Sequence, residues 1–442
     1  MTGRGARWAD AWRTQLWPLP VLSVVLAVAL GTMLPVLDAA VDDHLPPSVS
    51  MLLFSGGPEA AGAVLQSISG SLITVTSLTF SLTVVTLQLA SSQFSPRLLR
   101  TFTSDRFVHA TLALFLAAFA FALSVLRSVR REDGATTAFV PEISVTVAFV
   151  LAMVSVIGLV LFLAHLTREI RVETMMQRVG RETRETIDRV FPPDRPTQGP
   201  APGPGPGAIP VRSTRSGFLT SVDRDALVQA AVEASVVLRI DREPGCFLVE
   251  GVPFATAWPV VPGAVLPAPI REKLSEDVNA AVATGTERTN VQDVGFGFRQ
   301  LVDVAARALS PGINDPTTAV HVIGHLSVLL CRLATRSPGP EQVTDDEGRV
   351  RVIIVLPVLG DFLDLCLDQP RQYGAADPTV AKHLLLLLQE LAWCDPQDSY
   401  GKEIREHLGR MRDAINAVDQ PPADRRRLLD TVQTIGTTPP LG

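Results

Sequence analysis

Residues Val64–Ala90 read VLQSISGSLITVTSLTFSLTVVTLQLA and contain no charged side chain. An uncharged, mainly apolar stretch of more than about 20 residues is long enough to cross a bilayer as a helix. Between Ser67 and Thr86 the same stretch carries ten hydroxyl side chains. If lipid alone surrounded this helix, so many hydroxyls would find few hydrogen-bond partners outside it. We therefore expect part of this helix to face protein, water or a passing solute.

The polar residues of this stretch fall on two nearly opposite faces of a helical wheel. The first face is the candidate lining of a polar path: Ser69, Thr76, Thr79, Thr83, Thr86 and Gln93. The second face consists of Ser67, Ser71, Thr74, Ser81, Gln88 and Ser92. Two interpretations stay open. Either one face lines a water-filled path while the other bonds neighbouring helices, or the small hydroxylated residues serve close helix packing without any path.

Three other apolar stretches have the length and composition of membrane spans. Residues 1–166 are thus expected to form a transmembrane domain, with spans at about 17–37, 64–90, 107–126 and 143–166. Arginines are frequent before the first span, after the second and after the fourth, whereas residues 38–63 contain neither Lys nor Arg. The positive-inside rule then places both termini in the cytoplasm. Three arginines between the third and fourth spans count against this orientation.

The chain after the fourth span has the composition of a soluble protein. Residues 167–191 are expected to extend that span as a charged helix, and residues 192–208 form a Pro/Gly-rich linker. A small α+β unit at 209–262 then precedes a mainly helical cytoplasmic domain at 263–442, in which residues 351–356 form a strand or a buried helical turn. The predicted fold is mainly α, a four-helix transmembrane domain plus a cytoplasmic α+β domain.

The extension helix carries an apolar stripe with helical spacing, formed by Val172, Met176, Val179, Thr183, Ile187 and Val190. Two interpretations are open for this stripe. It packs either on the chain's own soluble domain or on a neighbouring subunit.

Two polar positions near the membrane and two at a helix joint are candidate sites. Arg97 and Arg100 follow the second span and either meet lipid phosphates or form the mouth of a pore. Asn314 and Asp315 lie between two predicted helices. Asp315 before Pro316 is a favourable N-cap, so this pair is a structural joint or, alternatively, a cation or ligand site.

The sequence contains no signature of a catalytic or metal site. His321 and His325 share a helix face, but no HExxH motif or cysteine pair supplies further metal ligands. The four cysteines are scattered and are expected to be free thiols. Phosphate-loop, GxSxG and dinucleotide-binding motifs are missing, and the net charge of −6 gives no sign of nucleic-acid binding. We expect no enzyme activity, cofactor or metal.

Three longer stretches carry a resemblance to a known family. They are Ser77–Arg97 (SLTFSLTVVTLQLASSQFSPR), Glu287–Asp293 (ERTNVQD) and Arg307–Ala319 (RALSPGINDPTTA). Together they resemble the bacterial membrane-protein family called domain of unknown function (DUF) 2254. The resemblance implies a four-span membrane domain with a cytoplasmic C-terminal domain, and it brings no activity and no assigned site residues.

These observations lead to two hypotheses of function. In the first, the chain is an inner-membrane protein that forms a homo-oligomeric ion channel or small-solute conduit, with the second span lining the path. In the second, it is a membrane-tethered sensor or scaffold whose cytoplasmic domain binds a ligand or partner without transport. The expected partners are the lipid bilayer, further copies of the chain and, for the channel, small ions.

Overall fold

The computed structural model describes residues 17–41, 53–93, 105–130, 139–169, 171–193, 202–395 and 397–437. The chain divides into two compact units, Met1–Thr174 and Met175–Gly442. We call them the membrane unit and the C-terminal unit, and we treat each by itself.

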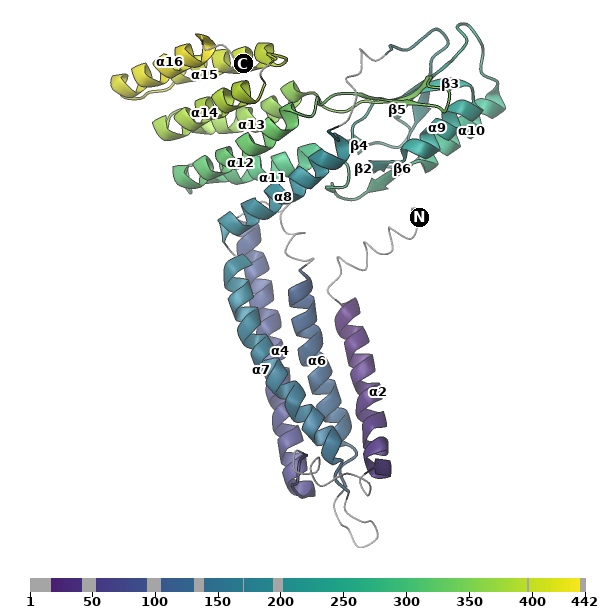
Figure 1. Ribbon diagram of the computed structural model, residues 1–442, viewed down its shortest axis with the longest axis vertical. Coiled ribbons are helices and arrows are strands. Elements are labelled where there is room, and N and C mark those ends of the chain that lie inside the picture. Colours follow the sequence, from purple (N-terminus) through teal and green to yellow (C-terminus); the bar gives the residue numbers. More distant parts are fainter. Residues whose placement is uncertain are drawn as a thin grey trace. The chain divides into compact units, whose positions relative to one another are not determined.

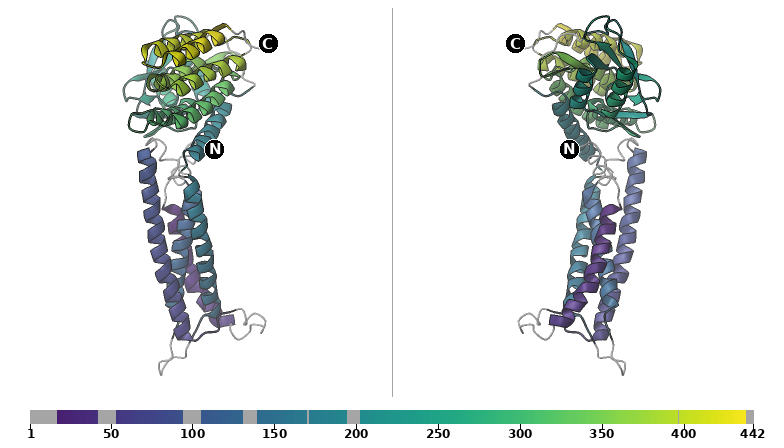
Figure 2. Two further views of the ribbon diagram at one scale, coloured as in Figure 1. Left: turned by 90° about the vertical axis from the view of Figure 1, so that its left-hand side faces the viewer. Right: turned by 90° about the vertical axis from the view of Figure 1, so that its right-hand side faces the viewer.

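Four long helices that lie side by side form the membrane unit (Figures 1 and 2). They are α2 (Pro18–Val41), α4 (Pro58–Gln93), α6 (Arg106–Leu126) and α7 (Glu142–Glu169). Each expected span lies within one of them, and α4 extends beyond the predicted 64–90 at both ends. Helix α6 packs against the other three and is the most enclosed. Large apolar side chains on α2 and α7, such as Leu22 and Val160, remain exposed, as expected for helices surrounded by lipid.

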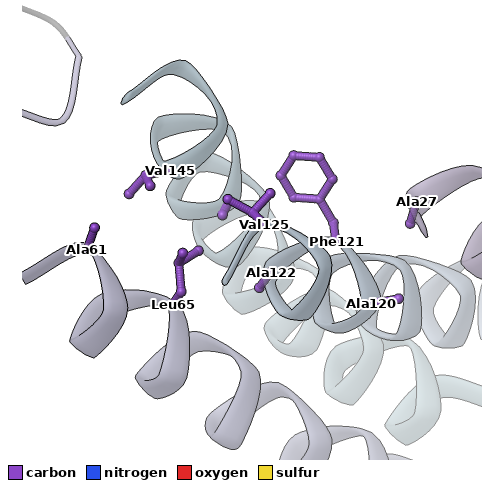
Figure 3. Close-up of a cluster of buried hydrophobic side chains, with 9 residues drawn as sticks. Ala27, Ala61, Leu65, Ala120, Phe121, Ala122, Val125 and Val145 are labelled. Carbon is purple, nitrogen blue, oxygen red and sulfur yellow. The ribbon is translucent and has the colours of Figure 1, made fainter. Parts of the chain in front are cut away.

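Small side chains let the helices of the membrane unit approach closely. One buried cluster joins Ala27, Ala61, Ala122 and Ala148 to the larger Phe121 (Figure 3). Helix pairs in membranes commonly associate through such small residues, because the backbones then gain close van der Waals contact. This cluster draws residues from all four helices and thus defines the packed interior of the unit.

A buried carboxylate links two helices at one end of the same unit. Asp38, which is 3 % exposed, accepts hydrogen bonds from the backbone N–H groups of Ile143 and Ser144 and from the Ser144 hydroxyl. The first N–H groups of a helix have no partner within it, so an acidic side chain there satisfies them. Asp38 therefore ties the last turn of α2 to the first turn of α7.

Five described helices, not four, are long and apolar enough to cross a membrane. The fifth is α12 (Pro316–Ala334), which lies in the C-terminal unit and packs on α11 and α14. Half of the residues in its most apolar 18-residue stretch are buried there.

The C-terminal unit contains two sheets. The first has five strands in the order β1-β5-β3-β8-β7, and the second has three in the order β4-β2-β6. Strands β3 and β8 are parallel, and the other neighbouring pairs are antiparallel. The strands are β1 (Ile209–Arg212), β2 (Gly217–Val222), β3 (Val236–Ile240), β4 (Phe247–Leu248), β5 (Pro253–Pro259), β6 (Val282–Gly285), β7 (Glu341–Thr344) and β8 (Val350–Ile354).

The sheets reach further along the chain than the expected 209–262 unit. Strand β6 completes the three-stranded sheet, and β7 with β8 completes the five-stranded one. The segment expected as a strand or a helical turn is thus the strand β8. Its side chains Val352, Ile353 and Ile354 are buried, because β8 lies in the interior of the sheet between β3 and β7.

Helices make up the rest of this unit (Figure 1). They are α8 (Val172–Val190), α9 (Arg224–Glu233), α10 (Ala268–Ala280), α11 (Val294–Ala308), α12, α13 (Leu359–Gly374), α14 (Pro378–Cys394), α15 (Gly401–Ala417) and α16 (Pro422–Thr437). Helix α8 is separate from α7, which ends at Glu169. Its apolar stripe is buried at Met176, Val179 and Ile187 within this chain. Of the two interpretations of this stripe, packing on the chain's own domain is the one found.

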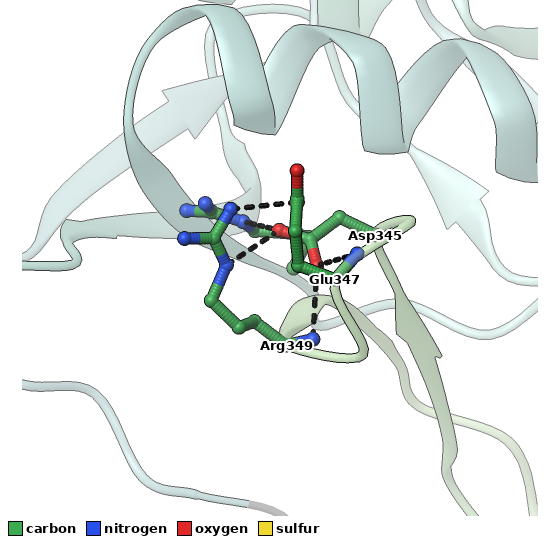
Figure 4. Close-up of polar contacts among 4 residues, drawn as sticks. Asp345, Glu347 and Arg349 are labelled. Atoms are coloured by element: carbon green, nitrogen blue, oxygen red, sulfur yellow. Dashed lines mark hydrogen bonds and ion pairs between the residues drawn. The ribbon is translucent and has the colours of Figure 1, made fainter.

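The turn between β7 and β8 is fixed by one carboxylate (Figure 4). Asp345 accepts hydrogen bonds from the guanidinium groups of Arg349 and Arg351 and from the backbone N–H groups of Glu347 and Arg349. Burial alone would raise the pKa of Asp345, but the bonds from Arg351 and Arg349 outweigh it and hold that pKa well below its usual range.

Candidate functional site

The face of α4 that we predicted to line a path is turned toward the other helices of its own unit. Ser69, Thr76, Thr79, Thr83 and Thr86 are all buried. The hydroxyls of Thr76 and Thr83 donate to the carbonyl oxygens of Leu72 and Thr79 one turn earlier, at 2.6 and 2.8 Å. We call this set the inward face. The side chain of Gln93, and Arg97 and Arg100 entirely, lie outside the described residues.

The opposite side of α4 is also polar, and it is exposed. Its side chains Ser67, Ser71, Thr74, Ser77, Ser81 and Gln88 all lie on the surface of the described unit. We call this set the outward face. Thr74 donates to the carbonyl oxygen of Gly70 at 3.0 Å. Within the described part of the chain, the hydroxyls of Ser67, Ser71, Ser77 and Ser81 have no such bond. A shallow hollow on this face is lined by Ile73, Thr74, Ser77, Leu78 and Ser81.

The outward face thus differs from the lipid-facing surface of α7. Exposed positions of α7 such as Val156, Ile157 and Val160 are large and apolar. The outward face instead places serine hydroxyls, which have no hydrogen-bond partner in the described chain, beside the exposed Leu78. In a bilayer, such a surface gains most from contact with another polar protein surface or with water.

The predicted joint at Asn314 and Asp315 has a clear structural role. Asp315 accepts hydrogen bonds from the backbone N–H of Thr318, at 3.1 Å, and from its hydroxyl, at 2.6 Å, so it is the N-cap of α12. These bonds lower the pKa of Asp315. Asn314 adopts a left-handed conformation with φ of 51°, which asparagine tolerates better than most residues. Both residues serve the turn from α11 to α12.

A second candidate site is a cavity of about 530 Å³ in the C-terminal unit. Its walls come from the end of α8, the Glu243-Pro244 turn, the segment 288–295 and one side of α13. Phe191, Leu356, Phe362 and Leu365 supply apolar surface, whereas Glu243, Arg288, Asp293, Arg299, Asp361, Asp364 and Asp368 supply charge. The cavity therefore combines apolar walls with ionic groups, as small-molecule sites commonly do.

The Glu287–Asp293 motif forms one wall of this cavity. Arg288 donates to both carboxylate oxygens of Asp293, at 2.7 and 2.9 Å, and its guanidinium lies over the Phe296 ring. Asp293 also caps α11 by accepting from the backbone N–H of Phe296. At Gly245, where φ is 96°, a Cβ would lie only 2.1 Å from Asp293 Oδ2. Only glycine allows this turn to approach the ion pair so closely.

The same motif is bonded to α8 and to the three-stranded sheet. The carbonyl oxygen of Asn290 accepts from Thr186 at 2.8 Å, and the Asn290 amide donates to Glu182 at 3.0 Å. The Gln292 side chain pairs with both backbone groups of Val222 in β2. The motif thus links the cavity to α8, the helix that directly follows the last helix of the membrane unit.

Glu243, one of the acids that line the cavity, has no ion-pair partner among the described residues. Burial raises its pKa, and the negative charges of Asp361 and Asp293 raise it further. Its carboxylate accepts a long hydrogen bond from the Cys246 thiol, with 3.9 Å between Sγ and Oε1. A positive charge placed beside Glu243 would relieve this repulsion.

The remaining candidates form no reactive cluster. Across the described ranges, no group of three or more His, Cys, Asp or Glu side chains is arranged to hold a metal ion. The four cysteines are free thiols. Burial raises the pKa of Cys331 to about 12, and Cys366 is fully buried, so neither favours the reactive thiolate form.

The sequence did not reveal the cavity. Glu243, Asp293 and Asp361 come from three distant segments, and no periodic pattern connects them. The available signals were the Glu243-Pro244-Gly245 turn and the ERTNVQD motif, each identified separately.

Comparison with known proteins gives a consistent family but no assigned activity. The family described as predicted membrane protein DUF2254 matches residues 13–390. Uncharacterised proteins of Mycobacterium bovis and Mycobacterium tuberculosis are 34% identical over 390 residues, covering 85% of this chain and 71% of each relative. No solved structure matches the chain.

Proposed function

The chain belongs to the DUF2254 family of predicted membrane proteins, and on that premise we propose that its copies assemble in the bilayer around the outward face of α4 to form a conduit for small ions. The exposed hydroxyl and amide groups of the outward face carry this proposal. They lie on a span without charged residues, where lipid cannot satisfy them.

A second copy is the partner that best fits this surface. Hydroxyl groups both donate and accept hydrogen bonds, so identical faces of Ser and Thr are complementary to each other. The open surface at Gly70, where a Cβ would meet nothing within 4 Å, also permits close approach of another helix. Where several copies surround an axis, the same groups would replace part of the hydration shell of an ion.

In this arrangement the two polar faces of α4 have different tasks. The inward face packs against its own unit, and the outward face lines the path. The arginines at 97 and 100 remain candidates for the mouth of the path. We further propose that four helices span the bacterial inner membrane and that both termini are cytoplasmic, in keeping with the arginine distribution.

Ion flux into liposomes that contain the purified protein tests the proposal. We expect Thr74→Leu and Ser77→Leu to reduce potassium or chloride flux by about tenfold or more, which corresponds to about 1.4 kcal/mol. Val160→Leu is the matched control, since it places leucine on the exposed apolar surface of α7, away from the outward face. The absence of flux with the unmodified protein, or full flux with both outward-face variants, would refute the conduit.

A sensor is the second candidate, and the bonds between the Glu287–Asp293 motif and α8 favour it. A ligand that shifts this motif would act directly on the helix that follows α7. In this case, a ligand found by screening the full-length protein changes the hydrogen exchange of α8. Asn290→Ala, which removes the bond to Glu182, reduces that change, whereas Gln229→Ala on α9 does not. A ligand that leaves α8 unchanged would argue against sensing.

A further inference from the structure

The cavity beside the Glu287–Asp293 motif has the dimensions of a small-molecule site. Its volume of about 530 Å³ lies in the usual range of roughly 300–1,000 Å³ for ligand pockets. Phe191 in the segment after α8, with Phe362 and Leu365 on α13, provides apolar walls. Such walls suit the carbon body of an organic molecule better than they suit a hydrated ion.

The charges that line the cavity are unequal in number. Five carboxylates face two arginines. Arg288 is occupied by Asp293, and the two acids furthest along α13, Asp364 and Asp368, form ion pairs with Arg410 and Arg371. Glu243 and Asp361 form no ion pair with any residue that the structure describes. The cavity therefore keeps two carboxylates that form no ion pair, beside one arginine, Arg299, that donates to the neutral Gln369.

We propose that this cavity binds a small organic cation, an amine or guanidine with an apolar body, whose charged group lies between Glu243 and Asp361. The carboxylates neutralise the cation and accept its N–H donors, while the aromatic side chains Phe191 and Phe362 cover its carbon body. The ion pair between Arg288 and the buried Asp293 fixes the wall against which the ligand rests.

Two other classes of ligand fit the cavity less well. A bare metal ion prefers several converging oxygen ligands, and the described chain offers no group of three acidic or other ligating side chains in such an arrangement. An anion would need a cation to receive it, yet Arg288 already donates to both oxygens of Asp293, and Arg299, the other lining arginine, donates to Gln369. The surplus of carboxylates would repel it.

Binding to the full-length protein in detergent provides the test. The probes are agmatine and phenylethylamine, with the neutral phenylethanol and magnesium chloride for comparison. A ligand that binds the folded state raises the melting temperature. We expect agmatine or phenylethylamine to raise it, and the neutral and metal probes to have no effect.

Variants of the two carboxylates locate the site. We expect Glu243→Gln and Asp361→Asn each to weaken binding of the amine by about tenfold or more, the loss expected for one hydrogen bond to a charged group. Glu272→Gln, an exposed acid on α10, is the matched control and keeps the affinity of the unmodified protein. Glu243→Gln should fold normally, because it removes a carboxylate whose charged form burial disfavours. Its melting temperature without ligand verifies this.

Failure of both amines to bind, unchanged affinity in both variants, or a larger shift with magnesium would overturn the proposal. These outcomes are independent of ion flux. The binding site and the conduit can therefore fail separately, whereas a confirmed amine would also supply the ligand for the sensor candidate.

Discussion

Thr79 stands apart from the other described hydroxyls of the inward face of α4. It is 1 % exposed and its Oγ1 has no hydrogen-bond partner in the described chain, whereas Ser69, Thr76, Thr83 and Thr86 each donate to a carbonyl oxygen of their own helix. A buried hydroxyl without a partner costs free energy of folding.

Replacing Thr79 by the similarly shaped valine should therefore stabilise the membrane unit. We expect Thr79→Val to raise the free energy of unfolding by about 1 kcal/mol, measured by thermal unfolding in detergent. Thr83→Val, which loses the bond to the Thr79 carbonyl oxygen, should bring no such gain. A clear loss of stability in Thr79→Val would mean that the hydroxyl has a partner in the assembled protein.

The lowered pKa of Asp345 predicts that the stability of the C-terminal unit depends on pH. Its pKa is lower in the folded than in the unfolded chain, so it stabilises the fold above its ordinary pKa of about 3.9, and this contribution is lost as the pH falls toward the folded value. Asp345→Asn should thus be less stable than the unmodified protein at neutral pH, and the difference should shrink below about pH 4. Fluorescence of Trp258, buried in the same sheet, can report unfolding. A difference independent of pH would contradict this role of Asp345.

At the level of elements, α8 and α11 approach each other closely at Gly297. A Cβ on Gly297 would lie 1.9 Å from Thr183 Oγ1. We expect Gly297→Ala to destabilise the C-terminal unit by about 1–3 kcal/mol, the usual cost of overpacking.

A second substitution identifies the cause of that loss. Adding Thr183→Ala to Gly297→Ala removes Thr183 Oγ1, the nearest atom, together with Cγ2, and should recover part of the stability in thermal unfolding. A double variant less stable than Gly297→Ala alone would show that the contact is not the reason. Gly436, which has open space around it, is the control position for a Gly→Ala change.

Periodicity explains which elements could be predicted. The 3.6-residue repeat of polar positions in Val64–Ala90 identified two faces of one helix, and the apolar stripe of α8 identified its buried side. The repeat could not decide which face of α4 turns inward, because both are rich in hydroxyls. That choice depends on α6 and α7, the helices against which α4 packs.

Pairings between distant segments could not be predicted either, because a local pattern in the sequence does not identify its partner in space. Strand β8 reads as a short apolar run, and nothing local in the Arg351–Leu356 segment points to β3 as its parallel neighbour. The cavity likewise needs Glu243, Asp293 and Asp361 together. Sequence alone identified the turn at Glu243 and the motif that ends at Asp293, but not their contact at Gly245.

For the whole molecule, the number of spans decides where the C-terminus lies. Four spans leave both ends on one side, whereas α12 as a fifth span would place the C-terminal helices outside. We expect α12 to stay out of the bilayer, since it packs on α11 and α14. A green fluorescent protein fused after residue 442 should therefore fluoresce, and a fused alkaline phosphatase should be inactive. The reverse pattern would favour five spans.

The central claim is that the outward face of α4 meets further copies of the chain in the membrane. Residues 1–174 contain no cysteine, so an introduced thiol is the only one in the membrane unit, and the four native cysteines of the C-terminal unit are the same in both variants compared. Oxidative crosslinking in native membranes compares Ser77→Cys on the outward face with Ile157→Cys on the exposed apolar surface of α7. We predict a covalent dimer from Ser77→Cys and none from Ile157→Cys; equal crosslinking at both positions, or none at Ser77, would contradict the claim.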